Sequence, residues 1–308
     1  MDSSFNRYHL DNGAVVLTEH LPFMRSVAVG VWIGYGSRTE SDADHGSAHM
    51  IEHMLFKGTA DKNPKDIAVA FESVGASFNA AASKEMTHLY ARVLGDRLPL
   101  AVWLLSDMAL RSVFPPDEFE REKQVVLEEI KSHEDIPEEI SYDYFLEDFF
   151  DGHGLAHGIL GSEDSASAMT RDRLFELYSQ AYRPAHLVVS VAGNLSGHDI
   201  PSLVSEALGP DNAPQCRFLS VEPAPARPRQ KLRLIPRDTF QTHLHLGFPG
   251  VPYSDDEFYV FSTLDMLLSG GMSSRLFQEV REKRGLVYDI ASDNVCYSDA
   301  GVFCVYAG

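Results

Sequence analysis

Residues 45–59 read HGSAHMIEHMLFKGT, and the spacing of histidine and glutamate within them points to a metal-binding helix. The apolar side chains between the polar ones favour a helix from about 46 to 56. Residues three and four apart share one face of a helix, so His49, Glu52 and His53 lie side by side there. Two imidazoles one turn apart can bind one Zn²⁺, and a neighbouring carboxylate can reach a water molecule on it. The stretch predicts zinc ligands at His49 and His53 and a general base at Glu52.

This order of residues, H-x-x-E-H, is the reverse of H-E-x-x-H and is typical of the inverzincin class of peptidases. A catalytic zinc usually has three protein ligands, so a further donor is required. The stretch EREKQVVLEEIKSHED at 120–135 supplies Glu129, and Glu122 lies two turns earlier on the same helix face. Glu128 is the rival ligand, but it projects about 100° away from that face. We expect Glu129 to be the third ligand and Glu122 to lie beside the site.

Composition limits the classes of partner. The chain has 308 residues, with 26 Lys and Arg against 45 Asp and Glu, for a net charge of −19. Nucleic acids and anionic membranes are polyanions, so neither is expected as a partner. A metal cation and a basic or unfolded peptide are both compatible with this charge.

The cysteines and the N-terminus indicate a cellular compartment. The three cysteines, Cys216, Cys296 and Cys304, are unclustered and predict neither a disulfide framework nor a cysteine zinc site. The first residues resemble no targeting helix, and no apolar run reaches the length of a membrane span. We therefore expect a bacterial-type cytoplasmic protein, or one of the mitochondrial matrix if a targeting segment has been removed.

The order of predicted elements suggests two domains of the mixed α/β class. The first is expected over 1–210, a Pro-rich and Ala-rich linker over 211–229, and a second domain over 230–308. Strand patterns cover 14–18, 26–33, 77–82, 87–93, 186–192, 232–236, 243–248 and 302–306. Helical patterns cover 46–56, 65–74, 98–112, 116–133, 138–150, 170–182, 257–268 and 273–284.

The zinc motif followed by Glu122 and Glu129 resembles the pitrilysin and insulysin type of zinc metallopeptidase. Three further stretches extend the resemblance, namely GASFNAAASKEMTHLYARVL (75–94), YRPAHLVVSVAGNL (182–195) and SGGMSSRLFQEVREKRGLVY (269–288). The form is closest to the bacterial branch that is similar to the mitochondrial processing peptidase. The resemblance implies two related α+β sandwich domains, each with a mostly antiparallel sheet and helices on one face. It also implies that the C-terminal part of the second domain is missing here. That part was either removed or is supplied by a partner.

The same resemblance implies roles for residues outside the zinc motif. Asn79 and Ala80 would lie on an edge strand that binds the backbone of a peptide. The alternative is that this strand only packs tightly within the fold. Arg281 would contact substrate, and Tyr288 would donate to the developing oxyanion. The alternative for this pair is an ordinary helix-end arginine and a core tyrosine.

The expected function is a zinc endopeptidase, with one Zn²⁺ per chain, that cleaves unfolded or presequence-like peptides. Residues 117–164 contain 16 acidic and three basic side chains, which form either a solvated face or a cavity lining that favours basic peptides. The alternatives are a non-catalytic subunit of a heterodimeric processing complex and a zinc-containing peptide-binding module. Association as a homo- or heterodimer is left open.

Overall fold

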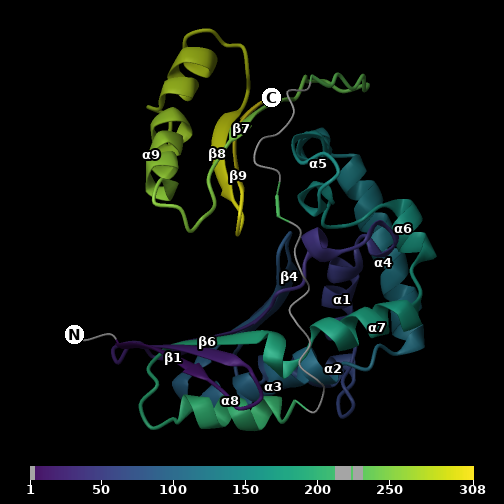
Figure 1. The fold of residues 1–308 in the computed structure, drawn as a ribbon, viewed down its shortest axis with the longest axis vertical. Coiled ribbons are helices and arrows are strands. Elements are labelled where there is room, and N and C mark those ends of the chain that lie inside the picture. The colour runs from purple at the N-terminus through teal and green to yellow at the C-terminus, as the bar shows by residue number, and fades with distance from the viewer. Residues whose placement is uncertain (1–3, 212–222, 225–231) are drawn as a thin grey trace. The chain divides into compact units, whose positions relative to one another are not determined.

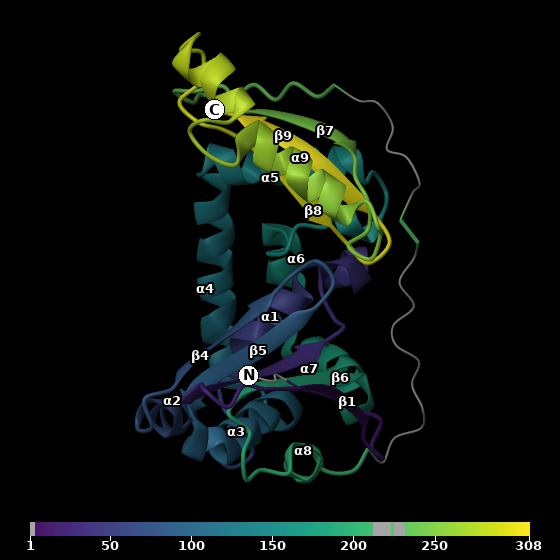
Figure 2. The same cartoon turned by 90° about the vertical axis from the view of Figure 1, so that its left-hand side faces the viewer.

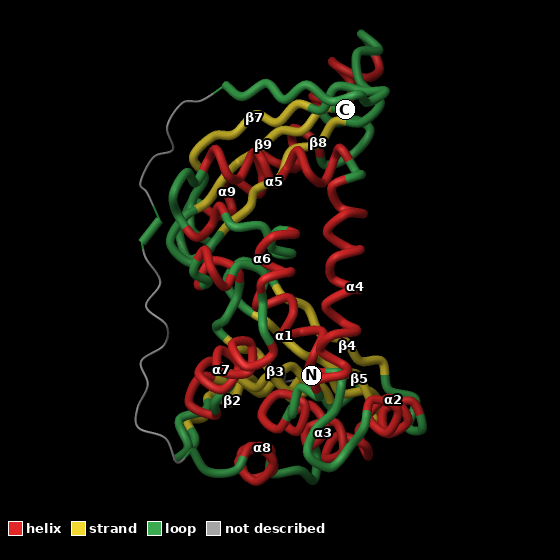
Figure 3. The backbone as a smooth tube through the Cα atoms, turned by 90° about the vertical axis from the view of Figure 1, so that its right-hand side faces the viewer, coloured by secondary structure: helices red, strands yellow, loops and turns green. Residues whose placement is uncertain are grey.

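A computed structural model describes residues 4–211, 223–224 and 232–308, and they group into two compact units. The first unit contains residues 1–128 and 159–220, and the second contains 129–158 and 221–308. Helix α4 (Pro116–Glu134) is continuous across the first of these boundaries (Figure 3). The predicted linker over 211–229 lies almost entirely outside the described residues. The predicted domain limits of 1–210 and 230–308 stay predictions.

The first unit is built on a six-stranded sheet in the order β1-β2-β6-β3-β5-β4. Figure 1 labels its strands β1, β4 and β6. All neighbouring strands are antiparallel except the parallel pair β2 and β6. Strand β4 forms one edge of this sheet (Figure 2). The strands are β1 (Ser4–His9), β2 (Val15–His20), β3 (Ser26–Ile33), β4 (Ser77–Ala82), β5 (Thr87–Leu94) and β6 (Leu187–Gly193).

Helices cover one face of this sheet. Helix α3 contacts β3 and β5, and α8 contacts β2. Alternate residues of β3 and β5, such as Val29 and Leu89, are buried, while Trp32 and Tyr90 on the opposite face are partly exposed. The helices are α1 (Ser47–Leu55), α2 (Pro64–Glu72), α3 (Leu98–Arg111), α6 (Glu163–Ala168), α7 (Arg171–Ala181) and α8 (Ile200–Leu208). Short 3₁₀ turns include η1 (Ser37–Thr39) and η2 (Asp42–Asp44).

The second unit has a three-stranded antiparallel sheet in the order β7-β9-β8. Helix α9 contacts β8, and α5 contacts β7. Phe149 of α5 and Val302 of β9 belong to one buried core. Its elements are α5 (Pro137–Phe149), β7 (Leu244–Pro249), α9 (Phe258–Ser269), the π-helical segment η6 (Phe277–Glu282), β8 (Ile290–Cys296) and β9 (Gly301–Ala307). Among the described residues, no helix combines the length and apolarity needed to cross a membrane.

Several predicted elements differ from the structure. The strand predicted at 232–236 is wrong, since that stretch is irregular, and the helix predicted at 273–284 contains the π-helical segment η6. Strands β1 and β8 and helices α6 and α8 were not predicted. Every residue of β1 is exposed, so it lacks the apolar alternation by which a half-buried strand is identified.

Candidate metal centre

Helix α1 carries three of the predicted site residues, and its apolar side anchors it in the first unit. Ala48, Met50, Ile51, Met54 and Leu55 are almost fully buried. The helix begins after Gly46, whose φ of 89° lies in the left-handed region that glycine adopts without strain. The packed face fixes the rotation of the helix and therefore the direction of the polar side chains.

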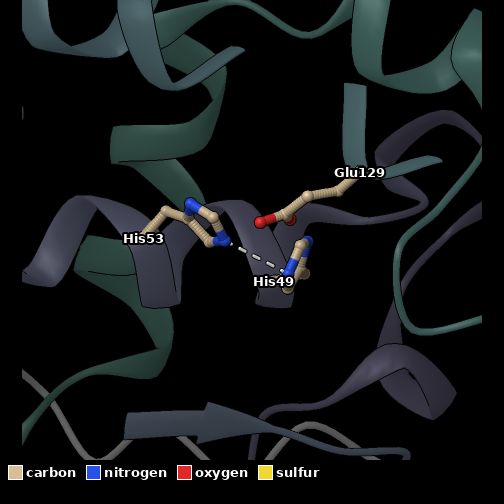
Figure 4. A group of neighbouring side chains, drawn as sticks. All are labelled: His49, His53 and Glu129. Carbon is tan, nitrogen blue, oxygen red and sulfur yellow. Dashed lines mark hydrogen bonds between the residues drawn. The ribbon is translucent and has the colours of Figure 1, made fainter. Parts of the chain in front are cut away.

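The two histidine side chains of α1 point toward each other. The Nε2 atoms of His49 and His53 are 3.2 Å apart, and the ring planes are inclined at 71° (Figure 4). In a tetrahedral zinc site with bonds of roughly 2.1 Å, two ligand atoms are about 3.4 Å apart. The observed distance between the two nitrogen atoms is thus close to the distance between two ligand atoms in such a site.

Glu129 approaches the same point from α4. One carboxylate oxygen of Glu129 and the ligand nitrogens of His49 and His53 lie within 4.8 Å of one another (Figure 4). Val126 and Ile130 on the same helix are buried, whereas Glu128 is exposed. Val125, next to Val126, is 43% exposed, so the buried face of α4 is narrow. The structure brings His49, His53 and Glu129 together and leaves Glu128 outside the group.

The hydrogen bonds around His53 fix its tautomer. Its Nδ1 lies 3.0 Å from Oε2 of Glu122, and Lys57 Nζ lies 2.7 Å from Oε1 of the same carboxylate. Burial acts to raise the pKa of Glu122, but the hydrogen bonds from Lys57 and His53 outweigh it and hold that pKa below its usual range. An ionised carboxylate only accepts, so Nδ1 of His53 donates and Nε2 presents a lone pair. This carboxylate–histidine pair is the arrangement that orients metal-binding imidazoles.

His49 is neutral over the physiological pH range. Burial, followed by the proximity of His53, lowers the pKa of His49 to about 4. A metal ligand must be the neutral imidazole, so no proton has to be removed from His49 before a cation binds. Two nitrogen donors, one carboxylate and a supporting carboxylate fit Zn²⁺.

Glu52 is held by the edge strand of the sheet. Its Oε2 accepts a hydrogen bond of 3.1 Å from the backbone N–H of Ala82, the last residue of β4. The N–H of Ala82 therefore faces away from β5, and by the two-residue period of a strand so does the N–H of Ala80. Asn79 is exposed opposite Tyr90, while Ala80, backbone included, is buried. The predicted peptide-binding strand is thus an edge strand that directly contacts the predicted base.

Arg281 and Tyr288 lie in the second unit and contact each other. The guanidinium of Arg281 lies 5.5 Å from the ring centroid of Tyr288 and 4.6 Å from that of Phe277. Tyr288 is 75% exposed. The roles of the pair toward substrate and oxyanion stay predictions.

Two contributors to the site were not predicted, namely Lys57 and Glu40. Lys57 follows His53 by four residues but lies beyond the end of α1 at Leu55, so helical spacing does not reveal it. Glu40 accepts from the backbone N–H groups of Gly46 and Ala48 at 2.8 and 2.7 Å. It lies outside α1, so helical periodicity does not reveal it.

Comparison with family models gives two matches. Residues 15–163 match the insulinase family, peptidase family M16, and residues 168–308 match the model described as the peptidase M16 inactive domain. The chain is 40% identical to an uncharacterized zinc protease of Streptomyces coelicolor, over 98% of this chain and 67% of the relative. It is 39% identical to the uncharacterized zinc protease YmxG of Bacillus subtilis, over 98% of this chain and 73% of the relative.

Solved structures show the same fold. A protease from Helicobacter pylori superposes with a TM-score of 0.93 at 23% identity, over 99% of this chain and 75% of that one. An M16 inactive-domain protein from Pseudomonas fluorescens superposes with a TM-score of 0.89 at 25% identity, over 99% of this chain and 74% of that one. With both parts of the sequence matched by its models, this chain belongs to peptidase family M16, the insulinase family.

Proposed function

We propose that the protein is a zinc-dependent endopeptidase that binds one Zn²⁺ through His49, His53 and Glu129. The observation that carries the proposal is the convergence of two imidazole nitrogens, 3.2 Å apart, and one carboxylate, with His53 oriented by a further carboxylate. Relatives named zinc proteases support the choice of metal and of reaction class. A bound zinc ion supplies a Lewis acid and lowers the pKa of a water molecule to about 7.

Glu52 is the proposed general base. It lies three residues after His49 and one before His53 on α1, so its carboxylate is on the side of the helix that faces the ligands. It would accept a proton from the attacking water and then deliver that proton to the leaving amine. The hydrogen bond from Ala82 holds one carboxylate oxygen in place, which limits the positions that the other can adopt.

The proposed substrates are unfolded or basic peptides bound in extended form along β4. Backbone N–H and C=O groups at a sheet edge bind an added strand with little dependence on its side chains. The side chains of Ala80, Ala81 and Ala82 are small; Asn79 is exposed on this edge, whereas Ala80 is 5% exposed. The net charge of −19 favours a positively charged peptide.

Glu52→Gln tests the proposal. The variant keeps the size of the side chain and the bond from Ala82 but cannot take up a proton, so we expect zinc binding without hydrolysis of a quenched basic peptide. Glu128→Gln makes the same change at an exposed position of α4 and is expected to retain activity. Full activity of Glu52→Gln would refute the proposed mechanism.

A non-catalytic subunit is the alternative function. The match of residues 168–308 to an inactive-domain model favours it in part, but the H-x-x-E-H stretch lies outside those residues. Zinc-loaded protein that binds peptides and never cleaves them, alone or with an added partner, would favour this alternative.

A further inference from the structure

The segment GSRTE at 36–40 joins β3 to the region before α1, and its centre is buried. Ser37 is fully buried and Arg38 is 5% exposed, and the segment forms the 3₁₀ turn η1. Buried polar groups are costly unless they are hydrogen-bonded, so their partners show what the segment connects.

One side of this segment contacts the turn after β4, residues 83–86. The N–H of Ser37 donates to the carbonyl of Ser83 at 3.1 Å, and the N–H of Arg38 donates to that of Lys84 at 2.7 Å. The Arg38 guanidinium forms an ion pair with Glu85 at 2.7 Å. Gly36 permits the close approach, because a Cβ there would lie 2.6 Å from the backbone nitrogen of Met86.

The other side of the segment contacts the first turn of α1. Oε2 of Glu40 accepts from the N–H of Gly46, and Oε1 accepts from the N–H of Ala48 and, at 3.2 Å, from the hydroxyl of Ser47. Tyr35 OH lies 2.6 Å from the same hydroxyl oxygen. A carboxylate bound in this way orients the helix start that leads directly to His49.

We propose that residues 36–40 act as a clamp that fixes the peptide-binding edge of β4 relative to the metal-binding helix. Arg38 and Glu40 are its positioning residues, and neither needs to touch substrate or metal. Arg38 holds the turn that ends β4, and Glu40 holds the start of α1. The proposal rests on the proposed function, because it assigns a peptide to β4 and zinc to α1.

The clamp predicts a separation of effects. Loss of the Arg38–Glu85 ion pair releases the end of β4, which weakens peptide binding and leaves the zinc ligands in place. Replacement of the Glu40 carboxylate by an amide turns one of the two acceptors that face Gly46 and Ala48 into a donor, which displaces the start of α1 and weakens zinc binding. A residue that merely stabilises the fold would alter both affinities together or neither.

The test measures binding rather than turnover, in the full chain carrying Glu52→Gln. Zinc affinity is obtained by competition with a chromophoric chelator, and peptide affinity by fluorescence anisotropy of a labelled basic peptide on zinc-loaded protein. For Glu85→Gln we expect peptide affinity to fall by about tenfold or more and zinc affinity to stay within about twofold. For Glu40→Gln we expect zinc affinity to fall by about tenfold to a hundredfold.

Matched controls separate positioning from stability. Asp96→Asn breaks the exposed ion pair with Arg97 at the other end of β5, and Asp199→Asn changes the carboxylate that caps α8. Neither is expected to alter zinc or peptide affinity. Arg38→Lys keeps a charge beside Glu85 and should retain more peptide affinity than Arg38→Gln.

Thermal unfolding of each variant shows which proteins are folded at the assay temperature. If Glu40→Gln is not folded at that temperature, Glu40→Asp is used in its place. Equal losses of zinc and peptide affinity in Glu85→Gln, or no change in either, would overturn the clamp. Failure of the proposed function is a separate result, namely intact binding with no peptide hydrolysis by the protein that retains Glu52.

Discussion

At the scale of single residues, the Glu122 carboxylate determines how well His53 binds a metal. It accepts from Nδ1 of His53 and forms an ion pair with Lys57. We expect Glu122→Gln to weaken zinc binding by about tenfold to a hundredfold, because the amide is a poorer acceptor and the ring is held less firmly. Chelator competition measures the change.

Glu128→Gln is the control for this prediction, since it removes the same charge from an exposed site on the same helix. If both variants lose the same affinity, the effect comes from the overall charge of α4 rather than from the bond to His53. Glu122→Asp, which keeps the charge, would then behave like wild type, whereas a positional role predicts an intermediate loss.

At the scale of elements, the start of α1 has a pH-dependent anchor. Burial raises the pKa of Glu40 to about 7, because desolvation outweighs the hydrogen bonds donated by the first turn of the helix. Between its ordinary pKa of 4.5 and pH 7, the folded protein retains a proton that the unfolded chain has lost. The contribution of Glu40 to the free energy of unfolding therefore falls as pH rises through this window, and it is constant above pH 7.

Glu40→Gln should remove this part of the pH dependence. We expect the Tm of zinc-free wild-type protein to fall relative to that of the variant between pH 4.5 and 7. The difference corresponds to a few kcal/mol, on the order of 1.4 kcal/mol per unit of pKa change. Thermal unfolding across pH 4.5–8 measures it, and parallel curves for the two proteins would contradict the assignment.

The edge strand β4 gives a second prediction at this scale. Ala80→Pro removes a backbone N–H that faces away from β5, and proline is tolerated in an edge strand where the sheet does not use the N–H. We expect KM for an extended peptide to rise by about tenfold, from the loss of one hydrogen bond and the local distortion, with zinc affinity unchanged. Ala80→Gly keeps the N–H and is the control. A KM unchanged by proline would exclude peptide addition through this group.

Local patterns predicted the elements that carry the site, and long-range contacts supplied the rest. The spacing of His49 and His53 is a property of one helix, so the sequence alone predicts that their rings meet. Glu129 required the additional assumption that a distant helix approaches α1. The bonds from Ala82 to Glu52 and from α1 to Glu40 join segments with no shared periodicity, and only the folded chain reveals them.

At the scale of the whole molecule, the first prediction concerns the second unit. The exposed side chain of Tyr288 is the proposed oxyanion donor. Tyr288→Phe removes only the hydroxyl, so we expect kcat to fall by about a hundredfold to a thousandfold with zinc affinity and KM nearly unchanged. Tyr259→Phe, on the exposed face of α9, is the control. A kcat equal to that of wild type would remove Tyr288 from the mechanism.

The net charge of −19 makes a prediction about substrate choice. Screening weakens attraction between exposed charges, since the Debye length is about 10 Å at 0.1 M salt and about 3 Å at 1 M. We expect KM for a peptide with four lysines to rise severalfold between 0.05 and 0.5 M salt, while KM for a neutral peptide of equal length changes little. Steady-state kinetics on the pair, with zinc held in excess, measures the difference. If both peptides respond equally, the acidic surface is a solvated face that plays no part in selecting basic substrates.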